Sequence, residues 1–236
     1  MNIKFTLESL PQVASVLPVT LFIAIVATFV GFLLAIGIAI ARERKIKVLA
    51  QVLGVLVSFI RGTPMIVQLY VVYYGLPQLL MYLANLGLDV QPQSLPHMII
   101  AVSAYALNAA ANLSETIRSA YRSVDYGQYE AAISVGMTPT RAMRQIIIPQ
   151  LIVNLVPNFS NFFLDLIKDT SLVYNIGIVE IMAKANIIAS LGFQYLETYL
   201  DALFVYLVIC FVFGKLLQVV EVLLRKHVFS NSLKTA

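Results

Sequence analysis

Amide and charged side chains recur inside otherwise apolar segments of this sequence. Asn158, Asn161 and Asp165 are spaced so that they share one face of a helix, and Asn161, Asp165 and Lys168 do the same. A charge inside a membrane span costs about 3 kcal/mol or more, so such side chains usually face protein or water. A stripe of this kind could bind a charged solute.

A second polar group interrupts an apolar segment at Arg61-Gly62-Thr63-Pro64. Gly62 and Pro64 would break or kink a helix there and leave backbone groups free. Broken helices near mid-membrane are common around the substrate sites of transporters. Arg61, or backbone N–H groups near Thr63, could hold a carboxylate of a solute.

Two carboxylates are candidates for binding a cationic group of a solute. Glu115 is expected at the inner end of one span, and Asp165 is expected near the outer end of another. The alternative is structural: Arg61 could pair with a carboxylate, and Asp165 could pair with Lys168 or Arg61. Lys168-Asp169-Thr170-Ser171 could instead form a gate, with Thr170 and Ser171 capping the next short helix.

The composition indicates an integral membrane protein. The 236 residues are 60% hydrophobic and 12% charged, whereas soluble domains are about 25% charged. The single cysteine, Cys210, excludes a disulfide framework and a cysteine-based zinc site, and His97 and His227 show no spacing of metal ligands. The net charge of +4 is better explained by orientation in a bilayer than by binding of nucleic acid.

The hydropathy pattern predicts an all-α protein with about five transmembrane helices, since a span needs about 20 apolar residues. The expected spans are residues 11–41, 48–83 with an interruption at 61–64, 95–114, 145–167 and 199–224. We expect one membrane domain, residues 1–236, because no short-period repeat or low-complexity segment is visible.

The basic residues predict the orientation. They cluster at 42–47, at 118–144 and at 215–234, and an odd number of spans places all three clusters on one side. Because positive charge favours the cytoplasmic side, we expect the N-terminus outside and the C-terminus in the cytoplasm. Residues 118–148 would then form a cytoplasmic loop.

Helix-capping signals divide this loop into two short helices. Asp125 and Gln128 fit a capping box, and Gly136 suits a left-handed residue after a helix. Thr138 and Pro139 fit the start of a second helix. Ala131, Ala132, Ile133 and Val135 would be exposed unless something covers them. The loop either folds back on its own bundle or docks a soluble partner.

The spacing of this loop resembles a family motif. Glu130-Ala131-Ala132, then Gly136, then Ile146, Ile148 and Pro149 is similar to the EAA loop of ABC importer permeases, E-A-A-x3-G-x9-I-x-L-P, with Ile148 in place of leucine. The resemblance implies a coupling helix that enters a groove on an ATPase subunit. It assigns this role to Glu130, Ala131, Ala132, Gly136, Thr138, Pro139 and Arg141.

Further segments resemble the permeases for polar amino acids, and the resemblance covers residues 15–225. Arg61-Gly62-Thr63-Pro64 with Gln68 is similar to R-G-T-P-x-x-x-Q, and residues 114–118 are similar to A-E-T-x-R with serine for alanine. Residues 161–172 are similar to N-x-F-[IL]-x-L-L-K-D-T-S-L. The substrate path implied by the matching positions and the charge pattern comprises Arg61, Thr63, Pro64, Gln68, Glu115, Asn161, Asp165, Lys168, Asp169, Thr170 and Ser171.

The resemblance also implies a type I ABC importer fold, a bacterial inner-membrane location and a set of partners. These are a second permease subunit, identical or different, two cytoplasmic ATPase subunits, and an extracytoplasmic binding protein for histidine, glutamine, arginine, lysine, cystine or a similar amino acid. The ATPase would use ATP and Mg²⁺, because this chain has no G-x-x-x-x-G-K-[ST] phosphate loop. We expect no enzyme activity, metal or cofactor in the chain itself.

Two other classes of protein compete with this interpretation. An ion-coupled secondary transporter would also place polar groups at mid-membrane, but it more often contains an inverted repeat, which five spans cannot provide. A membrane enzyme would need a catalytic cluster of histidines and carboxylates, and the sequence has none that is visible.

Overall fold

The computed structural model describes residues 3–88 and 95–234, and these residues contain helices and no β-strand. The helices are α1 (Ile3–Ala14), α2 (Leu17–Glu43), α3 (Lys47–Arg61), α4 (Met65–Asn85), α5 (His97–Arg122), α6 (Tyr126–Ser134), α7 (Pro139–Ala142), α8 (Ile148–Asp169), α9 (Ile181–Gly192) and α10 (Tyr195–Lys234). A π-helix, η2 (Met143–Ile147), precedes α8, and a 3-10 helix, η3 (Thr170–Ile176), follows it.

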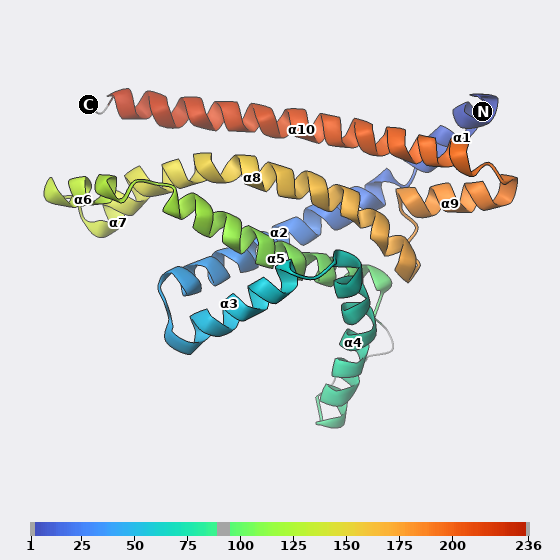
Figure 1. Ribbon diagram of the computed structural model, residues 1–236, viewed down its shortest axis with the longest axis horizontal. Helices are drawn as coiled ribbons and strands as arrows, with labels where there is room; N and C mark the ends of the chain where they lie inside the picture. Colours follow the sequence, from blue (N-terminus) through green and yellow to red (C-terminus); the bar gives the residue numbers. More distant parts are fainter. Residues whose placement is uncertain (1–2, 89–94, 235–236) are drawn as a thin grey trace.

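The long helices α2, α5, α8 and α10 run along the long axis of the molecule (Figure 1). The N-terminal helix α1 and helix α9 lie at one end of this axis. The connection between α2 and α3, the helices α6 and α7, and the C-terminal end of α10 lie at the other end. The three basic clusters of the sequence therefore lie at the same end of the bundle, as the charge pattern requires.

Small residues bring α2 and α5 close together at the centre of the bundle. Ala27 and Ala35 of α2 and Ala109 of α5 are fully buried. A Cβ atom on Gly31 would lie 2.4 Å from the Cβ of Ala109, so a larger residue would push the two helices apart. Small side chains of this kind let membrane helices approach closely, because lipid provides no hydrophobic force between them.

Within the part of the chain that the structure describes, four helical segments are long and apolar enough to cross a membrane, namely Lys4–Glu43, Met65–Asn85, Pro139–Ile176 and Tyr195–Lys226. The 26-residue helix α5 is long enough as well, but it carries asparagines and charges in addition to the apolar face that is buried against the other helices. A central helix need not be strongly apolar, because it faces protein rather than lipid. With α5, the structure agrees with the expected number of about five spans.

Two expected spans are divided in the structure. The first is split into α1 and α2 at residues 15–16, just before Pro18 in the first turn of α2. The expected second span is two separate helices, α3 with 15 residues and α4 with 21, and they run in clearly different directions (Figure 1). The reason is local: Pro64 has no N–H group and cannot continue the hydrogen bonds of α3.

Candidate coupling surface and translocation path

Helices α6 and α7 form two short helices around a glycine turn. The Asp125 carboxylate accepts a hydrogen bond from the N–H of Gly127 at 2.9 Å and caps α6. Gly136 follows the end of α6 with a φ of 87°, in the left-handed region. The Thr138 hydroxyl accepts from the N–H of Arg141 and caps α7, in which Pro139 is the first residue. These predicted helix boundaries are confirmed.

Gln128 differs from the expected capping box. Its side-chain oxygen accepts a hydrogen bond from Gln150 Nε2 at 2.5 Å, instead of the amide reaching back to the start of α6. A second bond, from Asn154 Nδ2 to Ser123 Oγ at 2.9 Å, lies beside it. Both bonds connect the segment around α6 to α8.

The outer surface of this loop is partly apolar, as expected. Glu130, Ala131, Ile133 and Val135 are exposed, and Val135 is 79% exposed. Ala132 differs from them: it is 4% exposed, because it lies on the inner face of α6 and the protein itself covers it. The exposed residues leave an apolar surface that no residue of 3–88 or 95–234 covers.

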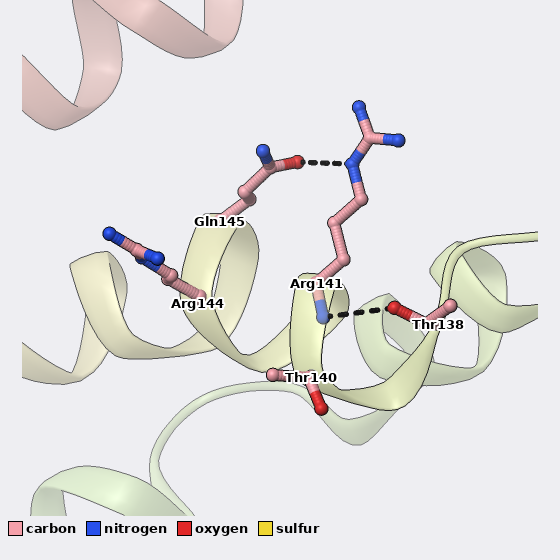
Figure 2. A pocket seen from close by; sticks show the side chains of 5 residues that line it. All are labelled: Thr138, Thr140, Arg141, Arg144 and Gln145. Carbon is pink, nitrogen blue, oxygen red and sulfur yellow. Dashed lines mark hydrogen bonds between the residues drawn. The ribbon is translucent and has the colours of Figure 1, made fainter.

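An open hollow of about 520 Å³ lies on α7 and the start of η2, between Thr138, Thr140, Arg141, Arg144 and Gln145. Figure 2 shows the side chains of Arg141 and Gln145 on the same side, joined by a hydrogen bond of 3.1 Å. Arg144 points away from this pair. Two arginines and no carboxylate line the hollow, so it is suited to an acidic partner.

The polar stripe predicted on α8 is present on one exposed face. Asn158, Asn161, Asp165 and Lys168 are all exposed in the single chain. Lys168 Nζ donates to Asp165 Oδ1 at 2.6 Å, with 56% and 67% of the two side chains exposed. The structure thus contains the ion pair that was the alternative for Asp165, and it leaves both charges accessible.

The predicted gate residues do not cap the following helix. Thr170 is buried, and its hydroxyl donates to the backbone oxygen of Ile167 at 2.7 Å. Ser171 lies within η3, which continues directly from α8. The cap of α9 is Glu180, whose carboxylate accepts from the N–H of Ala183 at 2.9 Å. Asp169 is exposed at the end of α8.

The break between α3 and α4 contains the other predicted path residues. Arg61 is the last residue of α3 and is exposed, and Pro64 directly precedes α4. Among residues 3–88 and 95–234, Arg61 forms no ion pair with a carboxylate. Gln68 reaches back from α4 to Thr63, with Nε2 at 2.9 Å from the Thr63 backbone oxygen.

Glu115 belongs to a cluster of charges at the C-terminal ends of α2 and α5. It is paired with Arg42 and, at 3.1 Å, with Arg118. Arg118 and Arg122 also pair with Glu43, at 3.3 Å and 3.2 Å. The structure therefore does not bring Glu115 and Asp165 together. Glu115 is held between two guanidinium groups, whereas Asp165 has one exposed lysine.

Residues 31–226 match the protein family described as "Binding-protein-dependent transport system inner membrane component". The chain belongs to this family. It is accordingly a multi-pass permease subunit of the bacterial inner membrane and not itself an enzyme, and permeases of this family work with an ATPase and a binding protein. An ion-coupled transporter is not supported.

The relatives of this permease align over nearly its whole length. It is 39% identical over 218 residues to the "Probable amino-acid permease protein YxeN" of Bacillus subtilis, covering 92% of this chain and 93% of the relative. It is 35% identical over 220 residues to the "L-cystine transport system permease protein TcyL" of the same organism, covering 93% and 90%.

Solved structures have the same fold. The permease superposes on a chain of an amino acid ABC transporter, crystallised with histidines, with a TM-score of 0.80 and 34% identity, over 94% of this chain and 98% of that one. A chain of an inward-facing methionine ABC transporter, MetNI, gives a TM-score of 0.69 at 15% identity, over 90% and 96%. The second likeness shows the fold alone.

Sequence reasoning did not assign a role to Glu180, a buried residue of the permease. It is fully buried, and its second oxygen accepts from the Tyr206 hydroxyl at 2.7 Å. Burial raises the pKa of the Glu180 carboxyl above its ordinary value, because loss of hydration disfavours the charged form. Glutamate is not among the preferred capping residues, so the residue type gave no sign that Glu180 caps α9.

Proposed function

We propose that this permease forms the path for a polar amino acid in an ATP-driven importer. Two observations support the substrate class. The relatives at 35% and 39% identity are named as permeases for L-cystine and for amino acids, and α8 carries an exposed pair of opposite charges. The observation that carries the proposal is this pair, Asp165 and Lys168, because a zwitterion can replace each partner with a group of the same charge.

The residues take separate roles in this proposal. Asp165 accepts the ammonium group of the amino acid, and Asn161 lies on the same face of α8. Lys168, Arg61 or the backbone near Thr63 holds the carboxylate. Glu115 remains in its pairs with Arg42 and Arg118, which already satisfy its charge. Asp169, Thr170 and Ser171 form the end of the path at the junction of α8 and η3.

The proposed complex contains two permease subunits, identical or different. In one chain the stripe of α8 is exposed, and polar groups at membrane depth need protein or water beside them. A second permease subunit facing α8 would enclose this space. The N-terminus lies outside and the C-terminus in the cytoplasm, in agreement with the basic clusters at one end of the bundle.

Two cytoplasmic ATPase subunits dock on the coupling loops, one on each permease subunit. The exposed apolar side chains of α6 and the basic hollow on α7 would enter a groove of the ATPase. The ATPase uses ATP and Mg²⁺, and an extracytoplasmic binding protein delivers the amino acid. Closure of the ATPase pair moves the short helices, and this motion drives alternating access.

Uptake into proteoliposomes tests the proposal. The permease is reconstituted with its ATPase and binding protein. Radiolabelled histidine, glutamine, arginine, lysine and cystine are then offered, with ATP placed either on the side of the membrane where the ATPase lies or on the opposite side. We expect uptake that needs ATP and the binding protein and that an ionophore does not abolish. Uptake driven by an ion gradient without the ATPase would reject the proposed function.

A further inference from the structure

A chain of three amide side chains links α5 to the break between α3 and α4. Asn112 Nδ2 donates to Asn108 Oδ1 at 3.1 Å, and Asn108 Nδ2 donates to Gln68 Oε1 at 2.9 Å. Gln68 Nε2 then donates to the backbone oxygens of Ile60 at 2.7 Å and Thr63 at 2.9 Å. Gln68 was expected on the substrate path, but its amide groups are engaged by the protein.

The backbone oxygens determine which group donates in each of these hydrogen bonds. A carbonyl oxygen only accepts, so Gln68 must turn its NH₂ group toward Ile60 and Thr63 and its oxygen toward Asn108. Asn108 must then donate to Gln68 and accept from Asn112. Reversing either amide would set two acceptors or two donors against each other. The three side chains therefore have one arrangement that satisfies all of them.

The hydrogen bonds of Gln68 compensate for a backbone donor that is missing at the break between α3 and α4. The carbonyl oxygen of Ile60 lacks the usual backbone donor four residues on, because Pro64 has no N–H group. It accepts weaker bonds from the Thr63 N–H at 3.4 Å and the Thr63 hydroxyl at 3.2 Å instead. Inside a membrane, such groups must find a donor within the protein. Gln68, in the first turn of α4, adds the shortest of the bonds to Ile60, at 2.7 Å, and also donates to the Thr63 oxygen. Its side chain thereby fixes how α4 starts relative to the end of α3.

Asn112, at the other end of this series of hydrogen bonds, lies on the face of α5 that carries Glu115. Asn108, Asn112 and Glu115 share one face of α5 by their spacing. Glu115 pairs with Arg42 of α2 and with Arg118. Helix α5 then leads through Asp125 into α6. One face of α5 thus connects the end of the molecule that carries the coupling loop with the break where Arg61 lies.

We propose that Gln68, Asn108 and Asn112 are positioning residues that transmit movement of the coupling loop to the break between α3 and α4. This inference rests on the proposed function. Gln68 acts through the backbone of residues 60–63 and does not touch the substrate. Loss of the hydrogen bonds among these three side chains therefore lowers the amount of amino acid transported per ATP hydrolysed, while the KM for uptake stays the same.

Two isosteric variants test this role. Gln68→Glu removes the donor to the backbone oxygens, and Asn108→Asp removes only the donor to Gln68. Gln78→Glu makes the same exchange at an exposed position of α4 and serves as the control. Each variant is purified as the complete complex with its ATPase and binding protein, and uptake and ATP hydrolysis are measured in proteoliposomes with the amino acid that the wild type transports.

We expect uptake per ATP to fall about five- to tenfold in Gln68→Glu and in Asn108→Asp, in line with the loss of one or two partly buried hydrogen bonds. The KM should stay within about twofold, and the Gln78→Glu complex should behave as the wild type. Asn108→Asp should add little to Gln68→Glu, because residues that act as one unit are not additive.

Several results would overturn the inference. Unchanged uptake per ATP in both variants would show that the three amide side chains do not transmit movement of the coupling loop. A raised KM with an unchanged kcat would place Gln68 in contact with the substrate, and loss of assembly in both variants would show a role in folding alone. A wild-type complex without ATP-driven amino acid uptake would instead reject the proposed function, and the inference with it.

Discussion

At the scale of single residues, two carboxylates that look alike in the sequence have different surroundings. The Glu115 side chain is 26% exposed and lies between Arg42 and Arg118. The Asp165 side chain is 67% exposed and contacts Lys168. An exposed ion pair contributes about 0–1 kcal/mol, so it can open at little cost. Asp165 can therefore exchange Lys168 for another cation, whereas Glu115 is fixed.

Asp165→Asn should lower uptake about tenfold, because a hydrogen bond to a charged group is worth about 1.5–3 kcal/mol. The amide keeps the size of the side chain but cannot balance an ammonium group. Assembly with the ATPase should be unchanged, since α8 lies apart from α6 and α7 at this position. Initial rates of uptake, normalised to purified complex, measure the effect.

Glu221→Gln is the matched control for this variant. Glu221 pairs with Arg225 on α10 at 3.0 Å, so the exchange removes the same kind of ion pair away from the stripe. We expect normal uptake from it. Normal kinetics in Asp165→Asn as well would mean that the pair with Lys168 is only structural.

The residues of α8 could be predicted from the sequence because their contacts are local. Asn161, Asp165 and Lys168 follow the helical period, and a period alone places them on one face. The pairs of Glu115 with Arg42 and of Asn108 with Gln68 join residues far apart in the chain. Their formation depends on how α2, α4 and α5 pack, which no spacing in the sequence specifies.

At the scale of elements, the turn between α6 and α7 depends on Gly136. A Cβ atom there would meet no other atom within 4 Å, so the backbone angle is the constraint on this position. An L-residue in the left-handed region costs about 1–2 kcal/mol, and a β-branched one is especially unfavourable there. The turn sets the angle between the two short helices that would meet the ATPase.

Gly136→Val should therefore reduce uptake and substrate-stimulated ATP hydrolysis together, by about tenfold for a cost of this size. Insertion into the membrane should be normal. Gly37→Val is the control, because a Cβ at Gly37 also meets nothing within 4 Å, but the residue lies in the helix α2. Equal activity of the two variants would contradict a role for the turn in coupling.

Helix ends with capping residues were predictable, and irregular helix was not. Asp125, Thr138 and Pro139 mark their helices through contacts within one turn. The π-helix η2 has no such signal, although Pro149 gives a reason for it afterwards. Proline cannot donate to the carbonyl four residues before it and its ring collides with that group, which favours a wider turn ahead of it.

At the scale of the whole molecule, the two ends of the bundle should face opposite sides of the membrane. The single native cysteine, Cys210, is first replaced by serine. Thr140→Cys, at the exposed start of α7, should then react with a membrane-impermeant maleimide only from the cytoplasmic side. Ser190→Cys, exposed on α9 at the opposite end, should react from outside. The reverse pattern would overturn the orientation.

The number of long helices was predictable because apolar length is a property of the chain itself. The position of α5 at the centre was not predictable, since its asparagines and charges make it look like the least suitable span. Packing explains it: α2 meets α5 through Gly31 and a row of alanines. The direction of α4 relative to α3 depends on the break at Pro64. The sequence predicts where this break lies but not the angle between the two helices.

The π-helix η2 has a consequence for the phase of the whole segment from α7 to α8. One extra residue in a helical turn rotates everything after it by about 100°. The direction in which Asn161 and Asp165 face is therefore set, relative to Arg141, by the five residues of η2. A deletion of one residue there would keep every side chain of α8 but turn its polar stripe toward a different neighbour. Chain length in this turn is thus as much a determinant of the path as the residues that line it.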